Sequence, residues 1–491
     1  MRTVIRGGWV VGFGGNSHTL IKNGVVVHDN NRIVHVGKDY HGQFDVEIDA
    51  TGMLVAPGFV DVHVHAGTRA GHRLISDGGR PEYFGTPILD VGVRHAAPRQ
   101  ANPLEIAAKI AEQMEIEAIF TVAELLRNGI TTFVEFGASQ EMHDAILSQV
   151  ERLGLRAYLG PGFYCGEWQA DIEGHLVRDL NQATGERTFR AALEYISRVD
   201  KSCDGRVRGI IVPRSVEACT PELLRRAREK ADELNLPMAI HAAYSVIEFH
   251  DLMHRYHMTP IEVLASVGML RPSVNIGHGN FISDNPNLNY SGGRDLALMG
   301  KAGVTVSHCA INIVRRARTL DTWERYRNAG VNMALGTDTY PRDMIMNMRT
   351  ASYLGKVTSR NLRAATSGEM FEAATLGGSR ALGRDDIGRL APGALADIII
   401  VDLARRDVLR YTPIFDPIKA LVECGVGDDI TMVIVDGVVR VKNGKVQGLD
   451  LGALRDQVQQ TAEAAWANWS ATDTFERKAN ELSPSSFPVI E

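Results

Sequence analysis

Two histidines separated by one residue close an apolar stretch near the N-terminus. In GFVDVHVHAG, His63 and His65 follow alternating apolar residues. Side chains two positions apart on a β-strand point to the same face, so both imidazoles are predicted to face one space. Imidazole is a frequent ligand of divalent transition metals. By itself the pair fits a metal site, and it fits equally well two hydrogen-bonded polar residues at a strand end.

Three further polar residues stand directly after apolar runs: His241 ends PMAIH, His278 ends SVNIGH, and Asp338 ends MALGTD. Each one alone is explained as a hydrogen-bonded strand end. Their joint occurrence is harder to explain by packing, because buried polar groups are costly without a shared partner. A divalent cation is such a partner. Imidazoles and a carboxylate with an open position for water suit one Zn²⁺, with Fe²⁺, Co²⁺ or Mn²⁺ as alternatives.

The elements that must position these residues alternate between apolar strands and amphipathic helices. Eight strand-like runs can be counted: MLVAPGFVDV, TTFVEF, LRAYLGP, RGIIVP, PMAIH, SVNIGH, GVTVSH and GVNMALGTD. Eight strand–helix units in series predict an α/β fold of the (β/α)₈ TIM-barrel type, in which the carboxyl ends of the strands meet at one mouth. The alternative, an open doubly wound sheet, would carry fewer strands and a glycine-rich fingerprint.

The two chain ends share a different texture of short strands joined by Asn-Gly and Asp-Gly turns. We therefore expect one small, discontinuous β-sandwich domain from residues 1–56 and 392–450, and a barrel from 57–391. Residues 451–491 are expected to form a helical tail that packs on its own barrel or on a neighbouring subunit. The long segment 66–104 is expected to cover the barrel mouth and to help select the substrate.

Composition narrows the function classes. The net charge of −6 provides no basic field for phosphate backbones, so nucleic acid is not expected as a partner. No apolar run is long enough to span a bilayer, and the N-terminus does not resemble a signal peptide. The five cysteines are widely spaced and lack a CxxC motif, as is typical of free thiols in a reducing cytoplasm. We expect a cytoplasmic homo-oligomer that acts on a small molecule.

The motif set resembles the amidohydrolase superfamily over roughly residues 1 to 450. GFVDVHVHAG, the later single histidines and TD at the eighth strand carry the resemblance, and GRLAPGALADIIIVDL is similar to the family's return into its sandwich. RAYLGPGF, VSHCA and LGTD place the chain near the hydrolytic deaminases and the triazine or phenylurea hydrolases. The resemblance implies that His63, His65, His241 and Asp338 bind the metal and that His278 lies beside the bound water or the substrate.

Two positions depart from the family pattern. The fourth strand, RGIIVPRS, lacks the lysine that bridges two metals in binuclear members, which favours one metal ion. Deaminases of this branch carry a glutamate three residues after the fifth-strand histidine, where this chain has Tyr244. A phenol with an ordinary pKa of ~10 is a poor base at neutral pH, so the chain is not expected to be an efficient purine or pyrimidine deaminase.

The expected reaction is hydrolysis of a non-peptide C–N bond. The metal lowers the pKa of its water, Asp338 takes the water's proton, and His278 donates a hydrogen bond to the developing oxyanion. An amide, carbamate or urea of a small aromatic or heterocyclic compound fits best. A deaminase or dechlorinase of an N-heterocycle is the alternative. A non-catalytic scaffold would be expected to have lost its ligands.

Four residues are predicted to contact the substrate. Arg214, after the fourth strand, either binds a carbonyl or anionic group or is a salt-bridged rim residue. Tyr244 can donate a hydrogen bond to a carbonyl oxygen. His308 ends the seventh strand, and Glu167 follows the third. Glu167 and Glu217 are alternative proton donors.

Overall fold

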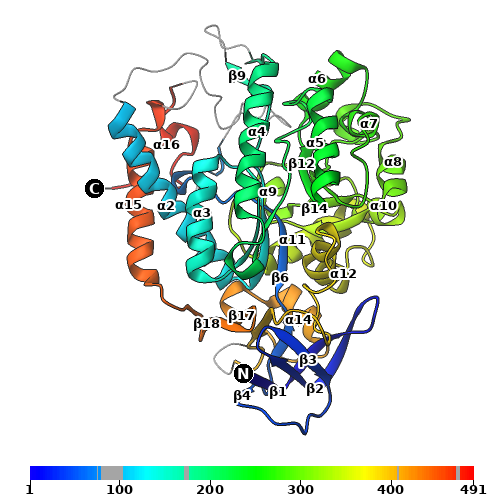
Figure 1. Cartoon of the computed structure of the whole chain (residues 1–491), viewed down its shortest axis with the longest axis vertical. Helices are drawn as coiled ribbons and strands as arrows, with labels where there is room; N and C mark the ends of the chain where they lie inside the picture. Colours follow the sequence, from blue (N-terminus) through cyan, green and yellow to red (C-terminus); the bar gives the residue numbers. More distant parts are fainter. Residues whose placement is uncertain (74–75, 79–102, 171–175, 406–408, 472–475, 491) are drawn as a thin grey trace.

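A computed structural model of the chain describes residues 1–73, 76–78, 103–170, 176–405, 409–471 and 476–490 (Figure 1). None of the helices within these ranges is both long and apolar enough to cross a bilayer.

Eight parallel strands form the centre of the molecule, in two four-stranded sheets. The first sheet holds β6 (Phe59–Val64), β7 (Ile130–Glu135), β8 (Arg156–Leu159) and β11 (Val207–Gly209), and the second holds β12 (Met238–Ala242), β13 (Val274–His278), β14 (Thr305–His308) and β15 (Asn332–Leu335). Parallel bridges between Ile211 and Met238 and between Val64 and Asp338 join the two sheets. The strands therefore close into the expected barrel.

The period-two pattern of the strands explains this closure. Alternate side chains point into the barrel, where Val60, Val62, Val134, Ile210 and Ala334 belong to one buried cluster. The intervening side chains, such as Phe59, Phe133 and Ile240, belong to the larger cluster that includes the surrounding helices. Strands buried on both faces read as continuous apolar runs, as these do.

Helices follow the barrel strands, and most of them cover the outer faces of the strands (Figure 1). They are α2 (Pro103–Arg127), α3 (Gln140–Leu153), α4 (Gln182–Val199), α5 (Pro221–Leu234), α6 (Val246–Tyr256), α7 (Pro260–Ser266), α8 (Asp295–Ala302), α9 (Ala310–Val314), α10 (Trp323–Asn328), α11 (Met344–Ser359), α12 (Ser367–Glu372), η5 (Ala373–Gly377) and α13 (Gly378–Ala381). Side-chain caps start many of them. Thr220, for example, accepts a hydrogen bond from the backbone N–H of Leu223 at the start of α5.

Both chain ends contribute to one nine-stranded mixed sheet. Its strands are β1 (Arg2–Phe13), β2 (His18–Asp29), β3 (Arg32–Gly37), β4 (Val46–Asp49), β5 (Leu54–Pro57), β16 (Ile398–Val401), β17 (Ile430–Val435), β18 (Val438–Lys442) and β19 (Lys445–Val446). The antiparallel pair β5 and β16 joins the N-terminal strands to the C-terminal ones. The hydrogen bonds define a single continuous sheet, so the expected association of the ends is observed, whereas a two-layer sandwich stays a prediction.

One expected strand is in fact two. The run MLVAPGFVDV was expected to form the first barrel strand, but it divides at Gly58 into β5 of the mixed sheet and β6 of the barrel. A Cβ atom on Gly58 would lie 2.2 Å from the side chain of Thr131, so only glycine fits at this crossing between the two sheets.

The C-terminal tail packs on its own barrel. Helix α15 (Leu451–Ala467) contacts α2 and the short helix η1 (Ala70–His72), and the indole N–H of Trp466 donates to the carbonyl oxygen of Gly71 at 2.7 Å. The short helix α16 (Ala479–Leu482) follows. Most of the predicted cover, including residues 79–102, lies outside the described residues, so its role stays a prediction.

Candidate metal centre

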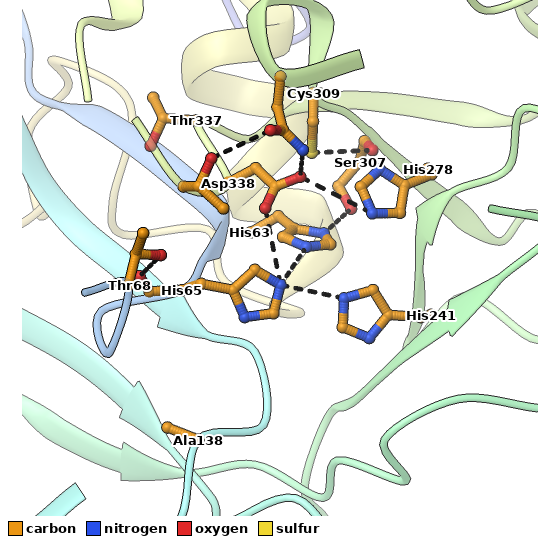
Figure 2. Close-up of polar contacts among 12 residues, drawn as sticks. His63, His65, Thr68, Ala138, His241, His278, Ser307, Cys309, Thr337 and Asp338 are labelled. Carbon is orange, nitrogen blue, oxygen red and sulfur yellow. Dashed lines mark hydrogen bonds and ion pairs between the residues drawn. The ribbon is translucent and has the colours of Figure 1, made fainter. Parts of the chain in front are cut away.

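Five predicted polar residues meet at one end of the barrel. His63 lies in β6, and His65 follows that strand directly; His241 and His278 belong to β12 and β13; and Asp338 comes shortly after β15. Figure 2 shows their side chains pointing toward one another. The strand order thus brings residues from positions 63 to 338 into one site.

The ligand atoms lie close together. The Nε2 atom of His65 lies 3.4 Å from Nε2 of His63 and 3.1 Å from Nε2 of His241. Asp338 brings Oδ1 to 3.6 Å from the same His65 nitrogen and Oδ2 to 3.8 Å from Nε2 of His278. These contacts bring the three imidazoles His63, His65 and His241 together, with the Asp338 carboxylate beside His65 and His278.

Contacts behind the rings determine which nitrogen carries hydrogen. His241 Nδ1 lies 2.7 Å from the carbonyl oxygen of Arg214, so it must donate, and Nε2 presents a bare lone pair. The Ser307 hydroxyl donates to the Ile276 carbonyl oxygen at 3.3 Å and can accept from Nδ1 of His63, also at 3.3 Å. Lone pairs that converge in this way repel one another unless a cation lies between them. The donor set therefore fits a divalent metal.

Burial keeps the imidazoles neutral. It lowers the pKa of His65 and of His241 to about 3, with the Arg214 charge adding to the effect at His65 and the His65 charge at His241. Burial also holds the pKa of His63 and of His278 well below the ordinary value. In contrast, burial raises the pKa of Asp338. Neutral imidazole is the form that binds metals, so the histidines are ready to act as ligands at neutral pH.

Two of the five residues have left-handed backbone conformations, with φ of +64° at Asp338 and +75° at His278. Such angles are unfavourable for residues other than glycine and persist only where neighbours hold them. At Asp338 the backbone N–H donates to the His63 carbonyl oxygen at 2.8 Å, and the carbonyl oxygen accepts from the His65 N–H at 2.8 Å. The hydrogen bonds that close the barrel thus also aim the carboxylate.

Small and flat neighbours make room for His63. A Cβ atom on Gly277 would lie 2.7 Å from His63 Cε1, and one on Gly336 would lie 2.4 Å from His63 Cβ. On its other side the imidazole stacks on the Phe136 ring, at 3.8 Å between centroids and 7° between planes. These three neighbours were not among the predicted site residues, although Gly277 directly precedes His278.

Cys309 is a site residue that sequence reasoning missed. Its Sγ atom, a ring nitrogen of His63 and a carboxylate oxygen of Asp338 all lie within 4.8 Å of one another. Burial raises the pKa of this thiol well above its ordinary value. The cysteine directly follows the seventh strand, within the VSHCA run, and this position could have indicated it.

A cavity of about 750 Å³ opens in front of His65 and His241. Its lining includes three of the four predicted substrate contacts, Glu167, Arg214 and Tyr244, together with Glu217, a predicted alternative proton donor. Arg214 forms an ion pair with Glu167, so a counter-charge accompanies it at the mouth. His308 is buried and its ring lies 5.9 Å from that of Trp323. Among the described residues His308 is not part of the cavity lining, and its role in substrate binding stays a prediction.

Two hydrogen bonds fix Tyr244, one at its hydroxyl and one at its backbone carbonyl. Its hydroxyl donates to Glu217 Oε1 at 2.9 Å, and its carbonyl oxygen accepts from the Arg318 guanidinium at 2.9 Å. Burial, followed by the nearby charges of Glu217 and Glu248, raises the pKa of the phenol well above its ordinary value. The hydroxyl therefore keeps its proton.

Comparison with known proteins shows the family of this chain. The amidohydrolase family model matches residues 54–440, which is most of the chain. A 5-methylthioadenosine/S-adenosylhomocysteine deaminase of Thermococcus sibiricus is 29% identical over 89% of this chain and 94% of its own length. A 5′-deoxyadenosine deaminase of Methanosarcina barkeri is 27% identical over 90% of this chain and 94% of its own. The zinc complex of the Arthrobacter aurescens atrazine chlorohydrolase superposes with a TM-score of 0.76, at 21% identity, covering 94% of this chain and 100% of that one.

The chain therefore belongs to the amidohydrolase family. It is an enzyme of the class that its motifs indicated, a hydrolase acting on carbon–nitrogen bonds other than peptide bonds. The alternative of a non-catalytic scaffold expected lost ligands, and all five predicted residues are present and together.

Proposed function

We propose that the protein is a zinc hydrolase with one metal ion per chain that cleaves the C–N bond of a small aromatic or heterocyclic amide, carbamate or urea. The observation that carries the proposal is the convergence of the Nε2 atoms of His63, His65 and His241 beside the Asp338 carboxylate. Two of these nitrogens are oriented from behind by hydrogen bonds, as ligands of catalytic zinc commonly are.

The chain's own residues supply the proton transfers. When bound, the metal supplies a water of lowered pKa and an electrophilic centre for a carbonyl oxygen. Asp338, whose Oδ1 faces His65, accepts the proton of the attacking water and passes it to the leaving nitrogen. His278, on the other side of Asp338, donates to the oxygen that gains negative charge.

A single metal ion is supported by the fourth barrel strand. Between Val207 and Ser215 the chain contains no lysine, so no carboxylated lysine can bridge two ions there. Arg214 occupies the end of this run, and its carbonyl oxygen positions His241.

Deamination or dechlorination of an N-heterocycle is the second candidate. The names of the relatives favour it, since several are adenosine-type deaminases and one structural neighbour is an atrazine chlorohydrolase. Tyr244 argues against it, because the phenol holds its proton and cannot shuttle one to a ring nitrogen as a carboxylate does.

A direct assay separates the candidates. Ammonia release is measured from guanine, adenosine, cytosine and aminotriazines, chloride release from chlorotriazines, and product release from aryl carbamates, ureas and amides. Turnover of the last group supports the proposal. Rapid release of ammonia or chloride from the heterocycles, with no turnover of the last group, replaces it with the second candidate.

We further propose a cytoplasmic homo-oligomer. The five cysteines are free, which suits a reducing compartment. Helix α11 exposes Met346, Tyr353 and Val357 at spacings that place them along one side, a surface suited to a subunit contact. Light scattering of the purified protein tests the oligomeric state.

A further inference from the structure

Glu217 and Tyr244 form a buried pair in the wall of the active-site cavity. Glu217 follows the fourth barrel strand and is 2% exposed, and its Oε1 accepts the Tyr244 hydroxyl at 2.9 Å. Both residues line the cavity that also exposes His65 and His241. Tyr244 lies three residues after His241, on the loop that follows β12.

The direction of this hydrogen bond follows from the groups that form it. A carboxylate only accepts hydrogen bonds, so the phenol must direct its single hydrogen at Glu217. The phenol oxygen then has only lone pairs left for another partner. Glu217 Oε2 is buried as well, and no donor among the described residues reaches it. Buried acceptors are normally satisfied, so Glu217 Oε2 is an acceptor still without a hydrogen bond among the described residues.

A buried cation and a second carboxyl group lie near Glu217. Arg178 Nη1 lies 3.9 Å from Glu217 Oε1, buried and itself without a hydrogen-bond partner among the described residues. Its other terminal nitrogen pairs with Asp251. Glu248, the other nearby carboxyl, accepts backbone N–H groups of Ala243 and Tyr244 at 2.9 and 2.7 Å. Burial, followed by the charge of Glu217, raises the pKa of Glu248 well above its ordinary value.

We propose that Glu217 and Tyr244 form an acceptor pair that binds an N–H group of the substrate at or next to the scissile C–N bond. Tyr244 thus acts as a hydrogen-bond acceptor toward the substrate, not as the donor to a carbonyl oxygen that its residue type alone predicts. The inference rests on the proposed function and narrows its substrate class. The substrate class is one with a free N–H on the reacting group, such as a urea or carbamate bearing N–H, and fully N-alkylated analogues are poor ligands.

The test compares phenylureas in which each N–H is replaced in turn by N-methyl. For the zinc-loaded wild-type enzyme, one of these replacements is expected to lower kcat/KM roughly ten- to a hundredfold, the worth of a hydrogen bond to a charged acceptor. In Glu217→Gln an amide N–H₂ replaces one acceptor, and in Tyr244→Phe the phenol oxygen is lost. In each variant, the ratio of kcat/KM between the N–H compound and its N-methyl analogue should fall to about threefold or less. The same two compounds are compared in every protein. Differences in their intrinsic reactivity and in the bulk of the methyl group therefore cancel when the ratio in a variant is compared with the ratio in the wild type.

Glu222→Gln serves as the matched control, since Glu222 is an exposed residue of α5 whose ion pair among the described residues is with Arg225. It should keep the wild-type ratio. Metal content and thermal unfolding are measured for every variant, and Tyr244→Phe keeps the test valid should Glu217→Gln fail to fold. A purely structural role of Glu217 would lower both rates equally and leave the ratio unchanged, which overturns the inference.

The proposed function and this inference fail differently. If no phenylurea is hydrolysed, the amide, carbamate or urea assignment loses support. The same ratios are then taken from dissociation constants of the phenylureas and of aminopyrimidines paired with their dimethylamino analogues, measured by calorimetry on the holoenzyme. A tenfold or greater preference for N–H that disappears in both variants supports the acceptor pair. Equal binding, or no binding of any N–H compound, overturns it.

Discussion

His241 shows how a single side chain is prepared for its role. Its Nδ1 donates to the Arg214 carbonyl oxygen, and its Nε2 faces His65 at 3.1 Å. We expect about one tightly bound divalent metal per purified chain. His241→Ala should lose both the metal and the activity, because it removes one of few ligands. Elemental analysis checks both statements, and close to two metals per chain would contradict the single-metal proposal.

Asp338 is expected to matter beyond metal binding. Its Oδ2 accepts the side-chain N–H of Asn312, which leaves Oδ1 facing His65 and the metal position. Asp338→Asn, reloaded with metal, should lose roughly 10²- to 10⁴-fold in kcat, the usual worth of a general base. Turnover near the wild-type rate in the reloaded variant would exclude Asp338 as the base.

At the scale of elements, His18 joins β2 to the barrel. Its Nε2 lies 2.9 Å from the Thr375 hydroxyl of η5, and that hydroxyl donates to the Phe371 carbonyl oxygen at 2.6 Å. The neutral ring therefore donates from Nε2. Burial lowers the pKa of His18 from 6.5 to about 4. Between these two values the unfolded chain binds more protons than the folded one, so this residue makes stability fall as the pH falls through this window.

This contact is testable by substitution. At pH 5, protonation of His18 in the unfolded chain should cost roughly 1–2 kcal/mol of stability that is present at pH 7.5. His18→Gln keeps a side-chain N–H for Thr375 but does not titrate. The free energy of unfolding of this variant should therefore change less between pH 7.5 and pH 5 than that of the wild type, by the same amount of roughly 1–2 kcal/mol. Urea unfolding at both pH values measures the difference. Identical pH dependence of the two proteins would show that His18 does not contribute.

At the scale of the whole molecule, a buried ion pair connects the barrel to the mixed sheet. Arg156 in β8 donates from Nε to Asp397 Oδ2 at 2.7 Å and from Nη2 to Asp436 Oδ1 at 2.6 Å. Asp397 is 1% exposed. Removing one partner of a buried pair leaves an uncompensated charge, which typically costs about 3–5 kcal/mol.

We therefore expect Asp397→Ala to lower the free energy of unfolding by several kcal/mol. Glu222→Ala breaks the exposed pair with Arg225 and should change it by less than about 1 kcal/mol. Urea titration of both variants provides the comparison. Equal effects of the two substitutions would mean that the junction between barrel and sheet does not depend on this pair.

The amino-acid sequence by itself determined the barrel architecture and the set of candidate metal ligands. Strand and helix periodicities are local, so the eight barrel strands were recognisable from runs such as SVNIGH and MALGTD. Each polar candidate directly follows such a run. In a parallel barrel all strand ends of one kind meet at one mouth, so topology alone brings His63, His241 and Asp338 together.

Only the tertiary structure decided how the remaining groups meet. The sequence does not reveal that Tyr244 donates to Glu217, that Cys309 reaches His63, or that Arg214 pairs with Glu167. Such contacts depend on side-chain rotamers and on loops that follow different strands, and neither leaves a periodic signal in the chain. The direction of the Tyr244 hydrogen bond depends on the position of Glu217 beside it. The same contact therefore decides whether Tyr244 offers a hydrogen-bond donor or an acceptor to a substrate.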